Sequence, residues 1–283
     1  MDDRVRAYAE LLVDYCLKVR PGWQILVRAT PLAQPLIQEL ARIVARREAF
    51  PLIRVEDETT ALTWALEAPE PLIAQMAPLD RYVDDHIDGE IFIRAPENTR
   101  AESLLPPARR TLLRQAQRPV LARRQSARVP WITCVYPTPA YAQDAGMALS
   151  EYEAFVFDAC LIDWPAEGRR MRRIADRFDR ADEVRILAED TDLRIRLGDR
   201  RGWVGEGYGN MPGGEVFYSP IEDSAAGVIR FNEDPVIWAG EEVDGITLIF
   251  DGGRVVEASA RRGEALLRQT LETDPGARVL GEL

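Results

Sequence analysis

The sequence predicts two domains, an α/β domain with a mainly parallel sheet over residues 1–181 and a β-rich α+β domain over residues 182–283. Helical stripes alternate with short apolar segments as far as residue 136, whereas short strands and turns dominate after Asp182. A length of 283 residues with 46% hydrophobic residues is sufficient for two cores of medium size. These observations together favour a two-domain α/β and α+β protein.

The first domain begins with a helix. Apolar residues recur at helical spacing from Val5 to Val19, and Pro21 and Gly22 end the pattern. The elements that follow alternate as expected for a helix-covered parallel sheet. They are strands at 24–29, 51–57, 90–95 and 130–136 and helices at 32–47 and 107–117.

Three connecting helices are predicted next, at 138–147, 150–162 and 166–182. In the second of them we expect Phe155, Phe157 and Leu161 to face the core. The third is rich in arginine, which predicts a solvated face. The second domain is predicted to contain strands at 184–189, 193–197, 216–220 and 227–231, a hairpin over 246–260 and a helix at 263–273.

Composition excludes several classes of function. The formal net charge of −11 repels phosphate backbones, so no nucleic-acid partner is expected. No apolar run approaches the length of a membrane span and the N-terminus is charged, so we expect neither an anchor nor a signal peptide and place the protein in the cytoplasm. Cys16, Cys134 and Cys160 lack metal-binding spacing and are interpreted as reduced, buried thiols.

Single residues narrow the chemistry further. Lys18 is the only lysine, which leaves little basis for Schiff-base chemistry. His86 is the only histidine and lies in a charged segment typical of a solvated helix end, so we expect no catalytic role for it. The arginines between Arg109 and Arg128 are likewise interpreted as a solvated face.

A nucleotide-binding α/β protein is one alternative, supported only by the topology of the first half. The glycine-rich segment GEGYGN at 205–210 is not followed by a predicted helix, and the turn after Ala29 contains no glycine. Neither segment therefore offers the glycine loop and helix N-terminus that hold a phosphate.

Glu215 and Glu282 are the candidate metal ligands. Each follows a glycine, in GGEVF and LGEL, where a compact backbone lets a carboxylate point into a site. Glu215 is placed between a glycine-rich turn and the apolar run Val216 to Tyr218, and a carboxylate at that position is costly unless something binds its charge.

The stretch NMPGGEVFYSPIEDSAAGVIRF at 210–231 closely resembles the signature of the metal-dependent aminopeptidases that include aminopeptidase T and aminopeptidase S. The segment 131–164 is similar to a second block of that family, although Ala148 precedes Ser150 where the family usually has serine sooner. GARVLGEL at the end is similar to a third. The resemblance covers essentially the whole chain.

The resemblance implies that Glu215 and Glu282 are ligands of a two-metal site for zinc, cobalt or manganese, and that they approach each other in the fold. It also implies peptide substrates, release of N-terminal amino acids by a metal-activated water, and a homodimer. No individual catalytic or substrate-binding residue is assigned.

The family's other ligands are histidines, a tyrosine and an aspartate that follow the LGEL segment, so the second domain is expected to be incomplete relative to the family. On this resemblance we expect the chain to be either a fragment or a naturally shortened form, with weak or absent metal binding and little activity on its own. The alternative function is a non-catalytic peptide-binding or assembly relative.

Overall fold

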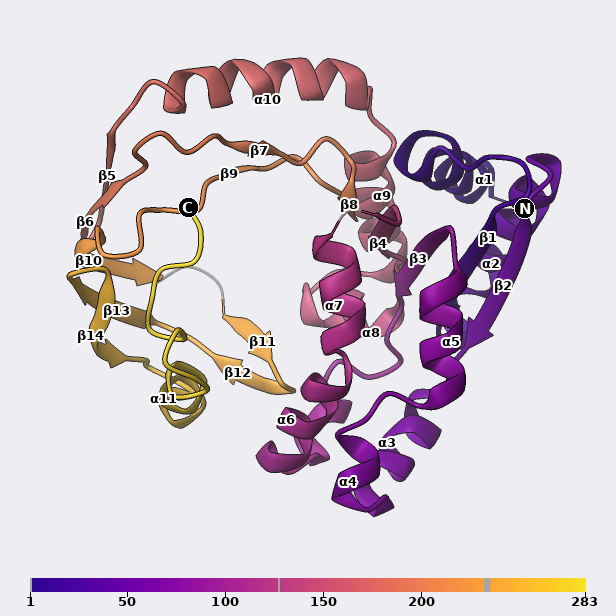
Figure 1. Ribbon diagram of the computed structural model, residues 1–283, viewed down its shortest axis with the longest axis horizontal. Coiled ribbons are helices and arrows are strands. Elements are labelled where there is room, and N and C mark those ends of the chain that lie inside the picture. The colour runs from indigo at the N-terminus through magenta and orange to yellow at the C-terminus, as the bar shows by residue number, and fades with distance from the viewer. Residues whose placement is uncertain (1, 127, 232–234) are drawn as a thin grey trace. The chain divides into compact units, whose positions relative to one another are not determined.

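The computed structural model describes residues 2–126, 128–231 and 235–283. The chain divides into two compact units, whose elements are labelled in Figure 1. The first unit contains the chain up to Trp164 together with residues 207–213, and the second contains residues 165–206 and 214–283. The chain therefore passes between the units three times. The sequence predicts a boundary after residue 181 between two domains that fold independently, and this boundary stays a prediction.

A five-stranded parallel sheet forms the centre of the first unit. The strand order is β2, β1, β3, β4, β8, and every neighbouring pair is parallel. The first four strands lie where the sequence predicts them, and the α/β character of this half is confirmed. The strands are β1 (Gln24–Ala29), β2 (Phe50–Val55), β3 (Gly89–Arg94), β4 (Trp131–Val135) and β8 (Gly209–Met211).

One face of this sheet carries the larger hydrophobic core. Ile25, Ile91 and Ile132 of the strands pack there with side chains of four helical segments. The predicted first helix is confirmed, although its second half is a π-helix that ends where Lys18 adopts a left-handed conformation. The segments on this face are α1 (Asp3–Glu10), the π-helix Leu11–Leu17, α2 (Gln34–Arg46) and α9 (Leu149–Cys160).

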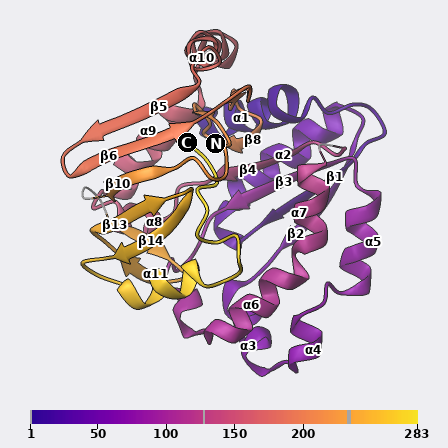
Figure 2. The same ribbon diagram turned by 60° about the vertical axis from the view of Figure 1, so that its left-hand side comes forward.

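The other face carries side chains such as Leu26, Arg28 and Glu90, which lie opposite a second group of helices, drawn in purple and magenta in Figure 2. Of this group the sequence predicts the span of one helix, α6, and the end of another, α5, at His86. Helix α3 was not predicted because only Ala65 in it is buried, so its sequence lacks the apolar stripe that indicates a helix. The group consists of α3 (Glu58–Glu67), α4 (Glu70–Ile73), α5 (Pro78–His86), α6 (Pro107–Ala116) and α7 (Arg118–Gln125).

An antiparallel five-stranded sheet organises the second unit, in the order β14, β13, β10, β6, β5. Leu193 and Phe250 of this sheet pack with Leu271 of α11 (Glu264–Leu271) in a second core. The predicted β-rich character is confirmed. The strands are β5 (Glu183–Ala188), β6 (Thr191–Arg196), β10 (Ala226–Phe231), β13 (Ile246–Asp251) and β14 (Arg254–Ser259), with the short pairs β7 (Trp203–Val204) and β9 (Val216–Phe217), and β11 (Val236–Trp238) and β12 (Glu241–Val243).

The connecting helices are α8 (Pro139–Asp144), α9 and α10 (Trp164–Phe178). In α9 the inward position of Phe157 is confirmed, and Leu161 beyond its end packs against the core. The prediction for Phe155 is wrong, because this side chain is 61% exposed. Two residues correspond to about 200° around a helix, so Phe155 and Phe157 cannot share a face.

All three cysteines are free and buried, as predicted. Burial raises the pKa of Cys16 to about 12 and that of Cys160 to about 11, which keeps both as neutral thiols. Among the helices of the described ranges, none combines the length and the hydropathy that a membrane span requires.

Candidate metal centre

Glu215 begins a short antiparallel ribbon in the second unit. Strand β7 pairs with β9 so that Trp203 lies opposite Phe217. The pairing extends further, because the Gly205 N–H donates to the Glu215 carbonyl over 2.8 Å. The backbone of Glu215, one residue before β9, is thereby held beside Gly205 in the ribbon.

The lack of a side chain at Gly205 makes room for the Glu215 carboxylate. A Cβ atom placed on Gly205 would lie 2.9 Å from Cγ of Glu215 and 3.4 Å from its Oε1. Non-bonded carbon atoms are most stable at about 3.5 to 4.0 Å. The Glu215 side chain therefore crosses the backbone of Gly205 on the same face of the ribbon.

The segment that carries Glu282 lies along the other edge of β9. The Tyr218 N–H donates to the Leu283 carbonyl and the Leu283 N–H donates to the Tyr218 carbonyl, both over 2.9 Å. Such a reciprocal pair is typical of antiparallel neighbours. Glu282 therefore lies opposite Ser219, four positions from Glu215, which is roughly 13 Å along an extended strand.

Alternation along the strands places Glu215 and Glu282 on the same face. Side chains alternate between the two faces of a strand, and directly opposite residues share a face. Glu215 lies three positions before Tyr218 and Glu282 lies one before Leu283, so both point away from the face that Tyr218 and Leu283 share. The two carboxylates meet if they lean toward each other along this face, and their close approach stays a prediction.

Two aromatic side chains share the face of Glu215. Phe217 is two positions further along the same strand, and Trp203 lies directly opposite Phe217. The ring centroids of Trp203 and Phe217 are 6.3 Å apart with an interplanar angle of 34°, and Trp203 is 55% exposed. An accessible apolar surface therefore adjoins the Glu215 carboxylate.

The opposite face of the ribbon is anchored by the buried Tyr218. Its hydroxyl lies 2.8 Å from Oδ1 of Asp179 and 2.9 Å from the Ala175 carbonyl oxygen. Hydrogen bonds from the Gly202 N–H, Tyr218 and Arg201 hold the pKa of Asp179 below its usual range. Burial and the hydrogen bond to Asp179 raise the pKa of Tyr218 to about 12. The ribbon is thereby tied to the end of α10.

Two glutamates are a partial donor set for a metal. Carboxylate oxygens suit hard divalent cations, and each carboxylate can bridge two ions. Within the described ranges, no three His, Cys, Asp or Glu side chains are grouped so that they could hold a metal ion. Glu215 and Glu282 have the carboxylate chemistry of such ligands, and their role as ligands stays a prediction.

The sequence pattern points to Glu215 and Glu282 but not to the residues that position Glu215. Gly205 lies in the segment GEGYGN, which continues into strand β8 and not into a helix, in agreement with the rejection of a phosphate loop. Trp203 and Gly205 are two positions apart in the sequence, and this alternate spacing is the pattern that places both on one face of the ribbon. That signal becomes readable only when β7 is known to pair with β9.

His86 is the last residue of α5 and belongs to the first unit, whereas both glutamates belong to the second. Its ring stacks on Tyr82 at a centroid distance of 4.0 Å, and its Nδ1 lies 2.7 Å from the Tyr82 carbonyl oxygen. The predicted solvated helix end is confirmed. The absence of a catalytic role stays a prediction.

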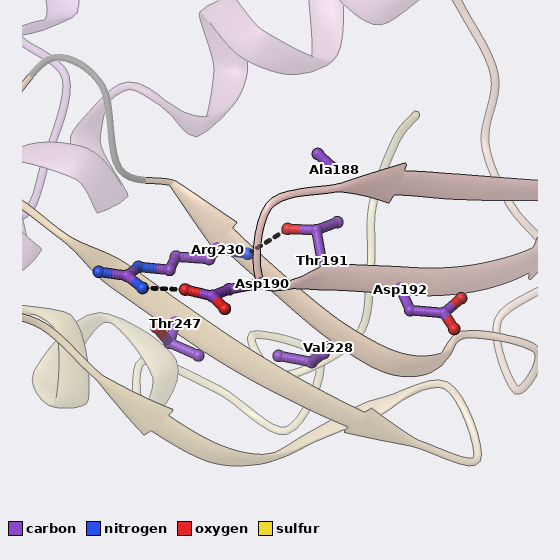
Figure 3. A pocket seen from close by; sticks show the side chains of 7 residues that line it. All are labelled: Ala188, Asp190, Thr191, Asp192, Val228, Arg230 and Thr247. Carbon is purple, nitrogen blue, oxygen red and sulfur yellow. Dashed lines mark hydrogen bonds and ion pairs between the residues drawn. The ribbon is translucent and has the colours of Figure 1, made fainter.

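A hollow on the sheet of the second unit is a weaker candidate (Figure 3). Its charged side chains are already paired, Arg230 with Asp190 and Asp192 with Arg185. The Arg230 N–H also donates to the Thr191 hydroxyl over 3.0 Å. The charges in this hollow therefore stabilise the strands and their connecting turn.

Comparisons with known proteins agree with the sequence motifs. Residues 1–283 match a family described as thermophilic metalloprotease (M29). The chain is 29% identical to Aminopeptidase 2 of Geobacillus stearothermophilus over 98% of its own length and 74% of the relative's. It is 30% identical to Aminopeptidase T of Thermus aquaticus over 63% of its own length and 50% of the relative's.

A solved structure is similar to the whole chain. Wild-type AmpT from Thermus thermophilus superposes with a TM-score of 0.80 at 24% identity, over 99% of this chain and 77% of that one. At this identity the likeness supports the fold alone.

Proposed function

The chain belongs to the M29 family of thermophilic metalloproteases, and from this premise we propose that it acts as a metal-dependent aminopeptidase with Glu215 and Glu282 as metal ligands. The match of the whole chain to the family carries the proposal. Relatives named aminopeptidase support the release of N-terminal amino acids from peptides as the reaction.

The residues of the ribbon have separate roles in this proposal. Divalent metals, when bound, supply a water of lowered pKa and polarise the peptide carbonyl. Glu215 and Glu282 provide carboxylate oxygens for two ions of the zinc, cobalt or manganese type. Gly205 leaves room for the Glu215 side chain, and Tyr218 holds the end of strand β9 in place through its contacts with Asp179 and Ala175. A fixed geometry of this kind removes part of the entropic barrier to reaction.

Trp203 and Phe217 are proposed to contact the side chain of the substrate's first residue. The exposed Trp203 ring and the half-buried Phe217 ring lie on the same face as the Glu215 carboxylate. Burial of an apolar side chain there contributes about 25 cal/mol for each Å² removed from water. The ribbon would thus favour peptides with an apolar N-terminal residue.

Residues 1–283 alone are proposed to turn over aminoacyl substrates only negligibly. Hydrolytic zinc sites typically use three protein ligands and a water, whereas the described residues present no group of three. The same observation favours the second candidate, a peptide-binding or assembly relative without catalysis. That candidate predicts peptide binding that persists in the presence of a chelator.

Metal binding tests the proposal directly. Titration with manganese or zinc should give binding that Glu215→Gln and Glu282→Gln each weaken, because each removes one anionic ligand. Glu257→Gln changes an exposed glutamate of β14 in the same unit and should leave binding unchanged. Equal affinity in all four proteins would place the metal site elsewhere. Robust metal-dependent hydrolysis of leucyl anilide by the 283-residue chain would refute the proposal that residues 1–283 alone are nearly inactive.

We also propose a homodimer in the cytoplasm. The family resemblance supports the dimer, and the buried free thiols suit a reducing compartment. Sedimentation equilibrium tests the first statement and cell fractionation tests the second.

A further inference from the structure

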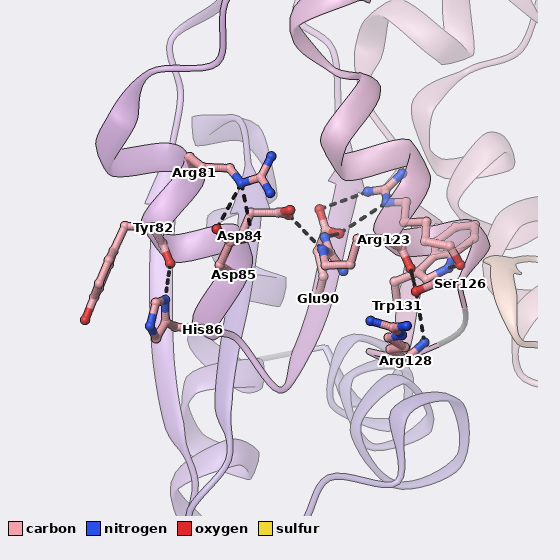
Figure 4. Close-up of polar contacts among 11 residues, drawn as sticks. Arg81, Tyr82, Asp84, Asp85, His86, Glu90, Arg123, Ser126, Arg128 and Trp131 are labelled. Carbon is pink, nitrogen blue, oxygen red and sulfur yellow. Dashed lines mark hydrogen bonds and ion pairs between the residues drawn. The ribbon is translucent and has the colours of Figure 1, made fainter.

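A buried cluster of charges lies beneath the helices on the second face of the parallel sheet (Figure 4). Arg123 of α7 donates to Asp84 over 2.7 Å and to Glu90 over 2.5 Å, and Arg124 donates to Glu90 over 2.9 Å. Glu90 is 1% exposed. Burial alone would raise its pKa, but the hydrogen bonds from Arg124 and Arg123 outweigh burial and lower it. The expected solvated face of Arg123 and Arg124 is therefore wrong.

A cavity of about 630 Å³ lies above this cluster, within the range of small-molecule sites. All of its lining residues belong to the first unit, where they lie in strands β1 to β3, in helices α3 to α7 or in the segments between these elements. Arg28 and Arg54 lie on its sheet side. Trp64 and Leu72, which are 49% and 56% exposed, lie on its helix side.

Arg28 has too few acceptors for its donors. A guanidinium carries five N–H donors. Its Nη2 donates to Glu56 over 3.3 and 3.5 Å, which are long bonds, and its buried Nε has no hydrogen-bond partner. Its side chain is only 25% exposed. A carboxylate that enters the cavity would supply two acceptors in the geometry that a guanidinium prefers.

The charges around the cavity balance. Four arginines and four carboxylates form ion pairs in or next to its lining, namely Arg28, Arg54, Arg123 and Arg124 with Glu56, Asp80, Asp84 and Glu90. A ligand without net charge preserves this balance. The side chains of Glu56 and Asp80 are 50% and 45% exposed, so their oxygens can also accept from an ammonium group.

We propose that this cavity binds a free amino acid with a bulky apolar side chain, as a zwitterion. The ligand carboxylate accepts from Arg28, its ammonium group donates to Glu56 or Asp80, and its side chain packs against Trp64 and Leu72. The proposal uses no residue of the ribbon and does not depend on the aminopeptidase reaction.

Calorimetric titration of the full chain tests it, with a chelator present so that metal plays no part. Phenylalanine should bind at concentrations up to about 10 mM. Phenylalaninamide lacks the carboxylate, 3-phenylpropionate lacks the ammonium group and glycine lacks the side chain. Each should bind about tenfold more weakly, since each loses one charge-assisted hydrogen bond or the apolar contact. No heat with phenylalanine, or equal binding of the amide or of 3-phenylpropionate, overturns the proposal.

Variants locate the binding. Arg28→Gln should weaken phenylalanine binding about tenfold, whereas Arg6→Gln, at an exposed arginine of α1, should not. Trp64→Ala removes a half-exposed ring and provides a second variant if Arg28→Gln fails to fold. Its matched control is Trp238→Ala, at a ring 46% exposed. Binding that survives Arg28→Gln and Trp64→Ala but is lost in Glu215→Gln would place the amino acid at the ribbon and refute the cavity.

Discussion

Glycine at position 205 determines where the carboxylate of Glu215 can lie. We expect Gly205→Ala to lower the affinity for manganese about tenfold, equivalent to about 1.4 kcal/mol, because the new methyl group displaces the Glu215 side chain. The fold should persist, since the atom that the methyl group meets most closely, Cγ, belongs to a side chain that can rotate. Metal titration and circular dichroism measure the two effects.

Gly281→Ala is the matched control for that substitution. It adds the same methyl group beside the other glutamate, where no atom lies within 4 Å. Equal losses of metal affinity in both variants would show that steric contact at Gly205 is not the cause.

The anchor at Asp179 predicts a pH dependence of stability. We expect Asp179→Asn to lower the free energy of unfolding by about 1 kcal/mol at neutral pH, because charge-assisted hydrogen bonds are lost. The folded pKa of Asp179 is lowered, so its contribution is complete above the unfolded value of about 3.9 and is lost as the pH falls through the folded value. Urea unfolding at several pH values should show the difference between the proteins shrinking below about pH 4.

An exposed turn provides the control for this pH dependence. Asp251→Asn at the β13–β14 hairpin should show no such trend. A stability difference for Asp179→Asn that is constant across the pH range would contradict the assignment.

At the scale of elements, the sequence predicted the helices and strands that are long enough to show a regular apolar pattern. The strands β1 to β4 and the β13–β14 hairpin were visible because they alternate or form continuous apolar runs. Strand β8 has only three residues, from Gly209 to Met211, and no period can be read from so few. The sequence places it in the second domain, whereas β8 pairs with β4 in the first sheet.

Close contact between strands β6 and β10 depends on Gly227. A Cβ atom there would lie 2.1 Å from the Asp192 carbonyl oxygen, and the residue has a φ of +119°. We expect Gly227→Ala to destabilise the second unit by about 1 to 3 kcal/mol beyond the cost of its φ, because backbone must move. Thermal unfolding measures this.

Gly214→Ala separates strain from contact. Gly214 has a similar φ of +103° but no atom within 4 Å of an added Cβ. If Gly214→Ala destabilises the protein as much as Gly227→Ala, backbone strain and not strand contact accounts for the effect.

For the whole molecule, the fold class predicted from the sequence is confirmed. Glu215 and Glu282 stay predicted ligands, and the sequence did not reveal the residues that surround them. The motif around Glu215 marks this glutamate as a candidate ligand, because a motif can be read from neighbouring residues alone. The position of the Glu215 side chain over Gly205 and the pairing of Tyr218 with Leu283 depend on contacts between segments that are distant in the sequence. The buried pairs of Arg123 were missed for the same reason, since their partners Asp84 and Glu90 lie far away in the sequence.

Two separate hydrophobic cores predict two unfolding transitions. The core of the first unit and that of the second share no residue. We expect Glu90→Gln to lower the first unit's transition, at a cost of about 3 to 5 kcal/mol, because it leaves buried arginines without their anion. Gly227→Ala should lower only the other transition. Scanning calorimetry of both variants checks this, and a single transition that shifts in both would contradict it.

The three passages of the chain between the units determine how it can be divided. A cut between Trp164 and Pro165 gives two polypeptides, and the second of them carries β8, whose place is beside Ile132 to Cys134 in the sheet of the first. In the first polypeptide alone β4 would be the last strand of the sheet, paired with β3 on one side and without a partner on the side where β8 belongs. In the cut protein, the second fragment therefore donates the edge strand of the first fragment's sheet. We expect the two fragments to assemble with each other when they are mixed.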